Sequence, residues 1–298
     1  MSERPGIWLV GAAGMLGRQL AGEFAARGIP VLASDREVDV RDAASLEAFA
    51  RKRRIGWIVN CAAYTAVDRA EDEPAAAFAV NATGTENLAR LAARLEAKLV
   101  HFSTDYVFAG DRAEPYREDD EPRPLSVYGR SKLEGERRLA LCLERFFLFR
   151  VSWLYGVHGA NFVHAMLRVF RERDEARVVD DQFGSPTYAG QLAANVAGLV
   201  ASGSERFGVY HYCDEGVVSW RQFAAAIQEL ALRAGMIGRA IPIAAVATAA
   251  YGARAPRPLH AVLDRRRVQE ELGFAVRPWR SNLEDFFREK AFLEGGRP

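Results

Sequence analysis

A tyrosine and a lysine, four residues apart, have the types and spacing needed for proton transfer. Tyr128 and Lys132 lie in the run Tyr128-Gly129-Arg130-Ser131-Lys132, and residues at i and i+4 share one face of a helix. A free phenol has a pKa of about 10, and a nearby ammonium favours its ionised form. We predict that Tyr128 exchanges a proton with substrate and that Lys132 tunes it and holds a nicotinamide ribose. The alternative is an accidental surface pair.

The preceding strand pattern ends in polar residues. The strand pattern ends in His101-Phe102-Ser103-Thr104-Asp105-Tyr106-Val107-Phe108. Residues at the carboxyl ends of parallel strands line the ligand crevice. Thr104 is therefore predicted to hydrogen-bond a substrate carbonyl beside Tyr128, and the alternative is that its hydroxyl only caps the turn.

Three glycines near the N-terminus have a spacing that suits a dinucleotide. Gly11, Gly14 and Gly17 follow the first predicted strand and open a helix, with Met15 and Leu16 between the last two. The first glycine permits the turn, the second admits a pyrophosphate, and the third allows close helix packing. An ordinary strand-to-helix turn is the alternative, but the βαβ context favours the dinucleotide.

The second predicted strand ends where an adenosine ribose is usually recognised. Asp35 suits a 2′-hydroxyl, whereas Ser34 and Arg36 suit a 2′-phosphate, so the expected cofactor is NADPH or NADH. Asp39, which precedes Val40, is a candidate for the adenine amino group, and a loop or capping role is the alternative.

Small side chains follow the third predicted strand. Cys61-Ala62-Ala63 would let a cofactor lie across the strand ends, although small residues also suit tight packing. No zinc spacing or disulfide framework can be built from Cys61, Cys142 and Cys213, so we expect no metal and a reducing compartment.

The elements that position these residues alternate along the first half of the chain. Strands are predicted at 7–10, 31–33, 57–61, 98–103 and 147–151, and helices at 15–27, 43–53, 75–95 and 131–144. Such alternation predicts an α/β fold, a Rossmann-like doubly wound parallel sheet. We expect residues 1–152 to form an NAD(P)-binding domain.

The alternation of predicted strands and helices is less regular after Trp153. Helices are predicted at 161–173, 190–201 and 219–232, with a strand at 208–212. We expect residues 153–298 to form mainly a smaller C-terminal substrate-binding lobe, with segments that return to the Rossmann domain.

Composition excludes several classes of protein. The 298 residues are 49% hydrophobic and 27% charged, with a net charge of +1. This balance does not favour nucleic acid or an acidic membrane as partner. No stretch reaches the roughly 18 apolar residues of a membrane span. With a buried-strand pattern at the N-terminus and no signal peptide before it, a cytoplasmic protein is expected.

Several runs together resemble the extended short-chain dehydrogenases and, more narrowly, the dTDP-4-dehydrorhamnose reductases. The resemblance extends nearly end to end. It is carried by Gly11-x-x-Gly14-x-x-Gly17, Asn60-Cys61-Ala62-Ala63-Tyr64-Thr65-Ala66-Val67-Asp68, Ser103-Thr104-Asp105-Tyr106-Val107-Phe108, Tyr128-Gly129-x-Ser131-Lys132-x-x-Gly135-Glu136, Arg150-x-Ser152-Trp153-Leu154-Tyr155 and Asp181-Gln182-x-Gly184-x-Pro186-Thr187.

The resemblance implies a reaction. Hydride passes from NAD(P)H to C4 of a dTDP-4-keto-6-deoxy sugar, dTDP-4-dehydrorhamnose, while Tyr128 protonates the carbonyl oxygen and gives dTDP-L-rhamnose. It also implies that Thr104 and Asp105 hold the substrate or a proton network. The remaining implied contacts are Tyr64 for the cofactor, and Tyr106, Val107, Phe108, Trp153, Asn161, Phe162, Gln182 and Arg257 for the nucleotide sugar. For Trp153 and Phe162, a place in the core is the alternative.

Two departures from the family pattern matter. The family's Arg-Pro-x-Asn-Ser appears here as Arg257-Pro258-Leu259-His260-Ala261, so contacts of the missing asparagine and serine are in doubt. Some family members dimerise through magnesium held by acidic residues. The matching positions are Met15, Gly190 and Gln191, so we expect a monomer, or a homodimer without a bridging magnesium.

Other functions on this fold remain as alternatives. Tyr106 stands where a 4,6-dehydratase needs an acid, which argues against dehydration. Another nucleotide-sugar ketoreductase or an epimerase stays open. A non-catalytic regulatory subunit is disfavoured by the presence of Tyr128, Lys132 and Thr104.

Overall fold

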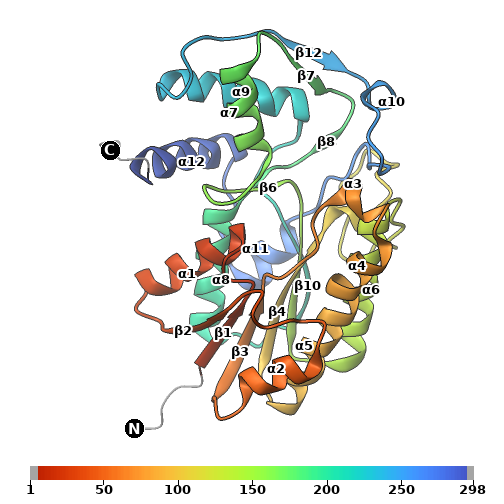
Figure 1. The fold of residues 1–298 in the computed structure, drawn as a ribbon, viewed down its shortest axis with the longest axis vertical. Coiled ribbons are helices and arrows are strands. Elements are labelled where there is room, and N and C mark those ends of the chain that lie inside the picture. Colours follow the sequence, from red (N-terminus) through yellow and green to blue (C-terminus); the bar gives the residue numbers. More distant parts are fainter. Residues whose placement is uncertain (1–5, 294–298) are drawn as a thin grey trace.

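A six-stranded parallel sheet forms the centre of the molecule (Figure 1). The computed structural model describes residues 6–293. The strands run in the order β10-β5-β4-β3-β1-β2, and every neighbouring pair is parallel. Their bounds are β1 Gly6–Val10, β2 Val31–Ser34, β3 Ile55–Asn60, β4 Lys98–Thr104, β5 Phe146–Val151 and β10 Gly208–Tyr212. The predicted doubly wound sheet is confirmed.

Helices cover both faces of the sheet, which explains why its central strands are apolar throughout. All seven residues of β4 are buried. One face carries α1 (Met15–Ala26) and α8 (Ala189–Ser202), which pack on each other. The other carries α2 (Ala43–Ala50), α5 (Thr85–Arg94) and α6 (Val127–Cys142).

The single helix expected at 75–95 is divided. It consists of α4 (Pro74–Phe78), a π-helix at Ala79–Gly84 and α5, preceded by the short α3 (Val67–Ala70). The helix is divided because its backbone packs closely against α6, a contact that hydrophobic periodicity does not indicate. A Cβ added at Gly135 of α6 would lie 2.1 Å from the carbonyl oxygen of Asn81, so the π-turn and α6 meet backbone to backbone.

Helix α6 begins at Val127, four residues earlier than expected. Its N-cap is Ser126, whose hydroxyl accepts the Gly129 N–H at 3.1 Å. Tyr128 therefore lies in the first turn of the helix, and Lys132 follows one turn later on the same side.

A second hydrophobic core forms a smaller lobe above the sheet in Figure 1. Its elements are β6 (Leu154–Tyr155), α7 (Phe162–Glu172), β7 (Ala176–Val179), β8 (Phe183–Gly184), β9 (Thr187–Tyr188), β11 (Val218–Ser219), α9 (Trp220–Arg233), β12 (Ile243–Val246), α10 (Thr248–Tyr251) and α12 (Trp279–Leu293). From the same half of the chain, α8, β10 and α11 (Arg266–Leu272) pack with the Rossmann sheet. The boundary at residue 152 stays a prediction.

Among the described residues, no helix has the length and apolar character needed to cross a membrane.

Candidate active site

A cleft of about 700 Å³ opens at the carboxyl ends of β1 and β3. The chain turns from β1 to β2 on one side, whereas β3 lies on the other, so this is the switch point at which open α/β sheets bind ligands. Of the residues predicted to bind cofactor, those that line the cleft are Gly11, Gly14, Asp35, Arg36, Asp39, Val40, Cys61, Ala62 and Ala63.

Two glycines of the turn are required by backbone contacts. Gly11 has φ +72°, and a Cβ there would lie 2.7 Å from the Ala62 nitrogen. A Cβ on Gly17 would lie 2.3 Å from the Gly11 carbonyl oxygen. Gly14 is the N-cap of α1 and has no side chain to bond the first-turn N–H groups. Those donors and the helix dipole fit a pyrophosphate.

Other predicted cofactor residues lie outside the cleft lining. Leu16 and Gly17 are buried in α1. Met15 packs beneath Gly159, where an added Cβ would contact the Met15 Cβ at 3.3 Å. Ser34 is buried, and its hydroxyl accepts the Trp8 indole N–H at 2.8 Å. These positions shape the loop and strand end around the cleft.

The end of the cleft beside β2 is rich in charged side chains. Asp39 forms an ion pair with Arg41 at 2.7 Å, and hydrogen bonds from Arg41 hold the Asp39 pKa below its ordinary value. The Asp39 carboxylate is thus engaged within its own loop. Arg36 is exposed at the cleft edge, and the Asp35 N–H donates to Glu37.

Lys132 is buried beneath β4. Its ammonium donates to the Phe102 carbonyl oxygen at 2.6 Å and lies 3.5 Å from Nε2 of His101. Burial lowers the pKa of Lys132 to about 8, against an opposing effect of Glu136. Burial also keeps the pKa of His101 well below its ordinary value, so the imidazole is neutral and Lys132 is the charged group of this pair at neutral pH.

Tyr128 lies beside the carboxyl end of β4. Its ring meets the ring of Tyr106 edge to face, with centroids 5.7 Å apart. Burial raises the pKa of Tyr128 to about 12, while a hydrogen bond with Thr104 opposes this rise. Tyr128 consequently holds its proton at neutral pH, as a proton donor must.

Thr104 is the last residue of β4, and its hydroxyl caps the turn, which is the alternative to the predicted substrate contact. Its hydroxyl donates to Asp105 at 3.0 Å and accepts the Tyr106 N–H at 3.1 Å, which caps the turn Asp105–Val107. Burial raises the pKa of Asp105 to about 7, and its second oxygen has no hydrogen-bond partner among the described residues. This unpartnered acid lies next to Thr104 and affects Tyr128 electrostatically.

The aromatic and apolar residues predicted to lie around Thr104 form two separate groups. Tyr106 contacts Tyr128 as described, and Tyr64 belongs to the same apolar cluster as Tyr128. Val107 and Phe108 are fully buried in a separate cluster, where Phe108 stacks on Tyr116 with centroids 4.3 Å apart. Both residues are 0% exposed, so the structure places the substrate contact expected for Val107 and Phe108 in the core and not in the cleft.

Aromatic residues of the small lobe form a stack. Trp153 adopts φ +45°, a left-handed conformation that is rare for a bulky residue. Its indole stacks on Trp220 with centroids 3.5 Å apart and an interplanar angle of 7°. Phe162 packs on the other side of this group, 4.5 Å from Trp220. The stack brings together two residues that the sequence predicted separately.

The polar residues expected around the nucleotide sugar are held by different partners. Gln182 accepts the Trp220 indole N–H at 3.1 Å and donates to Thr248, so it joins the aromatic stack. Asn161 caps α7 and donates to the Gly156 carbonyl oxygen. Arg257 forms an ion pair with Asp68 at 2.7 Å.

Sequence reasoning missed Trp220 and Asn81. Trp220 follows Ser219, which forms a capping box with Gln222, so a helix start was detectable but its approach to Trp153 was not. Asn81 donates to Ser131 of α6 at 2.9 Å and accepts the Tyr64 N–H at 2.9 Å. It lies inside the π-turn, which no sequence pattern indicated.

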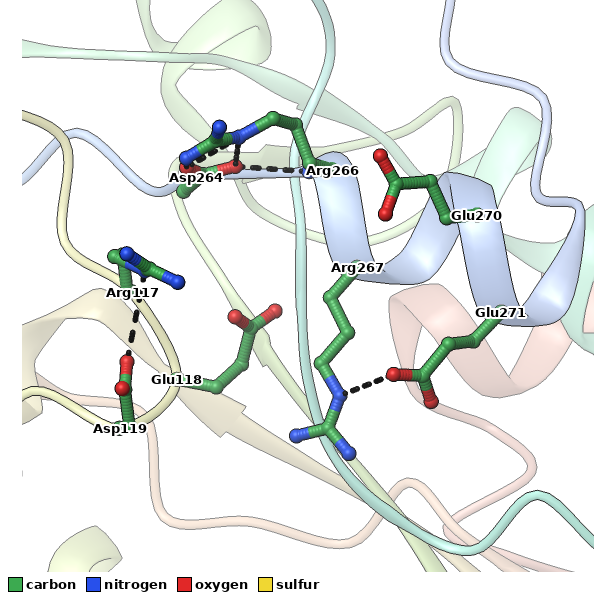
Figure 2. Close-up of a pocket in the computed structure, with 8 residues that line it drawn as sticks. All are labelled: Arg117, Glu118, Asp119, Asp264, Arg266, Arg267, Glu270 and Glu271. Atoms are coloured by element: carbon green, nitrogen blue, oxygen red, sulfur yellow. Dashed lines mark hydrogen bonds and ion pairs between the residues drawn. The ribbon is translucent and has the colours of Figure 1, made fainter.

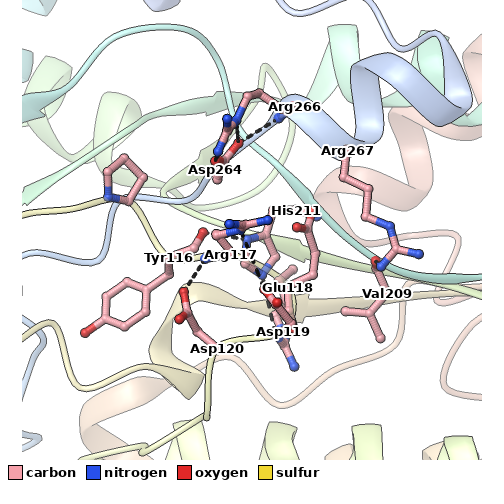
Figure 3. Close-up of polar contacts among 12 residues, drawn as sticks. Tyr116, Arg117, Glu118, Asp119, Asp120, Val209, His211, Asp264, Arg266 and Arg267 are labelled. Carbon is pink, nitrogen blue, oxygen red and sulfur yellow. Dashed lines mark hydrogen bonds and ion pairs between the residues drawn. The ribbon is translucent and has the colours of Figure 1, made fainter.

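A second depression, of about 390 Å³, lies beside α11 (Figure 2). Its three arginines, Arg117, Arg266 and Arg267, are each paired with a neighbouring carboxylate. Its floor is Glu118, which accepts the His211 N–H at 3.0 Å (Figure 3). None of its lining residues lines the cleft at the ends of β1 and β3, so the two depressions are separate.

A buried network of polar side chains lies behind Glu118 and reaches α6. Arg150 of β5 lies 3.4 Å from Nε2 of His211 and forms an ion pair with Glu136 of α6 at 2.7 Å. Both side chains of this ion pair are only 6% exposed. Glu136 also bonds Ser103 of β4. The network fixes α6 against β4 and β5.

The residues described here contain no cluster of histidine, cysteine or acidic side chains suited to a metal ion.

Comparison with known proteins supplies the family. The chain matches the family described as RmlD substrate binding domain over residues 6–292. It is 40% identical over 286 residues to a dTDP-4-dehydrorhamnose reductase of Streptomyces griseus, which covers 94% of this chain and 92% of that protein. It is 37% identical over 286 residues to the spore coat polysaccharide biosynthesis protein SpsK of Bacillus subtilis, covering 96% and 98%.

A solved structure agrees with the sequence relatives. The dTDP-4-dehydrorhamnose reductase of Bacillus anthracis, in complex with NADP, superposes with a TM-score of 0.89 at 37% identity and covers 96% of this chain and 99% of that one. The match over nearly the whole length shows that this chain belongs to the dTDP-4-dehydrorhamnose reductase family, the family of the RmlD substrate binding domain.

Proposed function

We propose that this chain reduces the C4 keto group of dTDP-4-dehydro-6-deoxy-L-mannose to give dTDP-L-rhamnose. The observation that carries the proposal is the hydrogen bond between Tyr128 and Thr104 at the carboxyl end of β4, with Lys132 one helical turn from Tyr128 and a dinucleotide cleft at the carboxyl ends of β1 and β3 in the same sheet. The family relatives named as reductases support the substrate class.

NADPH or NADH is the proposed hydride donor. The residues present fit such a cofactor, because the uncapped first turn of α1 faces the cleft beside Gly11 and Gly14. The related Bacillus anthracis reductase binds NADP. When bound, the cofactor supplies the hydride for C4.

The chain's own residues handle the proton and the carbonyl. Tyr128 donates its phenolic proton to the carbonyl oxygen as hydride reaches C4, so one proton and one hydride convert the ketone to an alcohol. Lys132, charged at neutral pH, favours the phenolate that Tyr128 becomes. To hold the carbonyl oxygen, the Thr104 hydroxyl turns its single proton away from Asp105, the acceptor at 3.0 Å in the structure, and donates it to the substrate.

On the sugar side, the Trp153 and Trp220 stack offers an apolar wall, and Gln182 and Arg257 offer hydrogen bonds. We further propose that residues 153–298 mainly bind this sugar, and that the protein acts in the cytoplasm as a monomer or as a homodimer without bridging magnesium. Three free cysteines support a reducing compartment.

The test follows NADPH and NADH oxidation by absorbance, with the keto sugar generated in situ by a 4,6-dehydratase and a 3,5-epimerase. We expect oxidation that depends on the epimerase, and Tyr128→Phe is expected to lower kcat by about 10²- to 10⁴-fold. Cofactor binding without any oxidation would overturn the proposal and favour another nucleotide sugar or an epimerase.

A further inference from the structure

One segment passes from the small lobe to the cofactor domain and is anchored at both ends. We call residues 248–260 the strap. At its start, the Thr248 N–H donates to the Asp181 carboxylate at 2.9 Å. At its end, the His260 N–H donates to the Gly110 carbonyl oxygen at 3.1 Å. Figure 1 shows the strap descending from α10 toward α3.

The middle of the strap is held by a single carboxylate. Asp68, in α3, accepts the Ala255 N–H at 3.1 Å with one oxygen and the Arg257 guanidinium at 2.7 Å with the other. A more exposed pair, Arg254 with Asp72, lies just outside it. The side chains of Arg257 and Asp68 are 22% and 44% exposed, so the contact lies near the protein surface.

The same turn of chain contacts the catalytic helix. The carboxylate of Glu71, which ends α3, accepts the Val127 N–H at 2.7 Å, immediately before Tyr128. Burial raises the pKa of Tyr106, and the nearby Arg257 guanidinium opposes this rise. The Tyr106 ring in turn contacts Tyr128. Arg257 is thus held close to the reacting end of the cleft.

Arg257 keeps most of its hydrogen-bonding capacity unused. A guanidinium has five N–H donors, and the bond to Asp68 uses one nitrogen, Nη2. Its Nε is buried and has no hydrogen-bond partner among the described residues. A buried unpartnered donor is costly unless a ligand or water satisfies it. The remaining donors match the oxygens of a diphosphate.

We propose that Asp68 is a positioning residue for Arg257, holding the strap on α3 so that the guanidinium is preorganised for the diphosphate of the nucleotide sugar. This inference rests on the proposed function and assigns to Asp68 a part in substrate affinity. Asp68 bonds the strap backbone as well as the side chain, so its loss frees both the segment and the guanidinium. In the variant, the strap and the guanidinium must become ordered when the ligand binds, and this entropic cost weakens the affinity.

The opposite arrangement is that Asp68 competes with the diphosphate for Arg257. The two arrangements differ in sign, because removing a competitor strengthens binding whereas removing a positioning residue weakens it. The backbone bond to Ala255, which a phosphate does not replace, favours positioning.

The experiment compares Asp68→Ala and Asp68→Asn with the matched control Asp72→Ala in the full chain. dTDP binding is measured by calorimetry, and kinetics are measured with the keto sugar and NADPH. For Asp68→Ala we expect the dTDP Kd and the sugar KM to rise about 3- to 10-fold, with kcat and the NADPH Kd within two-fold. Asp68→Asn keeps one acceptor oxygen, which can serve either the Ala255 N–H or the Arg257 guanidinium, and is expected to recover part of the affinity. Asp72→Ala is expected to match wild type.

A second measurement reports the strap without any activity. The Ala255 amide, bonded to Asp68, is expected to exchange hydrogen faster in Asp68→Ala and at the wild-type rate in Asp72→Ala. Tighter dTDP binding, unchanged affinity, or an equal loss in kcat and NADPH binding by Asp68→Ala would overturn the inference. Failure of the proposed function would appear separately, as a wild-type protein that does not oxidise NADPH with the keto sugar.

Discussion

The two sides of the cleft are built by different means. On the cofactor side, backbone meets backbone: Gly11 approaches Ala62, and Gly17 approaches Gly11, at distances that exclude any side chain. In the small lobe, which we propose as the substrate side, side chains from distant segments meet, as in the stack of Trp153 on Trp220. The first surface is fixed by the turn itself, whereas the second exists only once the lobe has folded.

This difference predicts how each side responds to amino-acid substitutions. A misplaced backbone cannot rotate away, so an added methyl group on the cofactor side must displace the turn. Side chains can shift, and a loss on the substrate side is shared among several partners. We therefore expect steep, cofactor-specific losses on one side and graded, substrate-specific losses on the other.

The largest effect on cofactor binding is expected for Gly17→Ala. Its Cβ would lie 2.3 Å from the Gly11 carbonyl oxygen and 2.8 Å from the Ala12 Cα, both backbone atoms. Displacing the turn is expected to weaken NADPH binding by about 100-fold, measured by fluorescence titration. Gly22→Ala in the same helix is the control, because no atom lies within 4 Å of its added Cβ. Equal NADPH affinities of the two variants would contradict the view that backbone contacts fix the cofactor side.

Lys132 is buried beneath β4, and this burial is predicted to lower the stability of the protein. Folding lowers its pKa from 10.5 to about 8. Between these values the unfolded chain binds a proton that the folded protein does not, so stability rises with pH through this window. Below pH 8 both states are charged and the full cost is present.

Lys132→Met removes this cost. We expect the variant to be inactive yet more stable than wild type by roughly 1–3 kcal/mol at pH 7, the lost bond to Phe102 offsetting part of the gain. The gain should shrink toward pH 10.5, as measured by urea unfolding across pH. Lys98→Met is the control, because the Lys98 ammonium bonds two carbonyl oxygens and pairs with Glu205, and its loss should destabilise. A Lys132→Met variant with no pH-dependent gain would contradict the role of burial.

The same contrast explains what the sequence could reveal. Gly11, Gly14 and Gly17 act within one turn, and Tyr128 and Lys132 within one helix, so spacing alone predicted them. Asp68 and Arg257 are 189 residues apart, and no local pattern joins them. The predicted start of α6 was four residues late, because Ser126 caps the helix before Tyr128. The π-turn was not predicted, because it depends on the close approach of the Gly135 backbone, which no local pattern reports.

On the substrate side, Trp220 offers the next test. Trp220→Ala removes the ring that stacks on Trp153 and the indole N–H that Gln182 accepts. Aromatic pairs contribute about 0.5–1.5 kcal/mol, so the sugar KM is expected to rise about 3- to 10-fold with the NADPH Kd unchanged. Trp220→Phe should retain stacking and lose less. Steady-state kinetics measure both, and an equal loss of NADPH affinity would show that the two sides are not separable.

The smallest effect expected is at Arg36, and it sharpens the description of the cofactor side. Arg36 is exposed at the cleft edge beside Asp35, where a ribose 2′-substituent would lie. Exposed charge pairs contribute at most about 1 kcal/mol, so Arg36→Ala is expected to raise the NADPH KM about 2- to 5-fold and leave the NADH KM unchanged. Because screening weakens exposed charges, the difference should shrink at high salt. Parallel changes with both cofactors would mean that Arg36 acts on the shape of the loop. A change confined to NADPH would mean that this side chain reads the phosphate while the glycine turn binds what the two cofactors share.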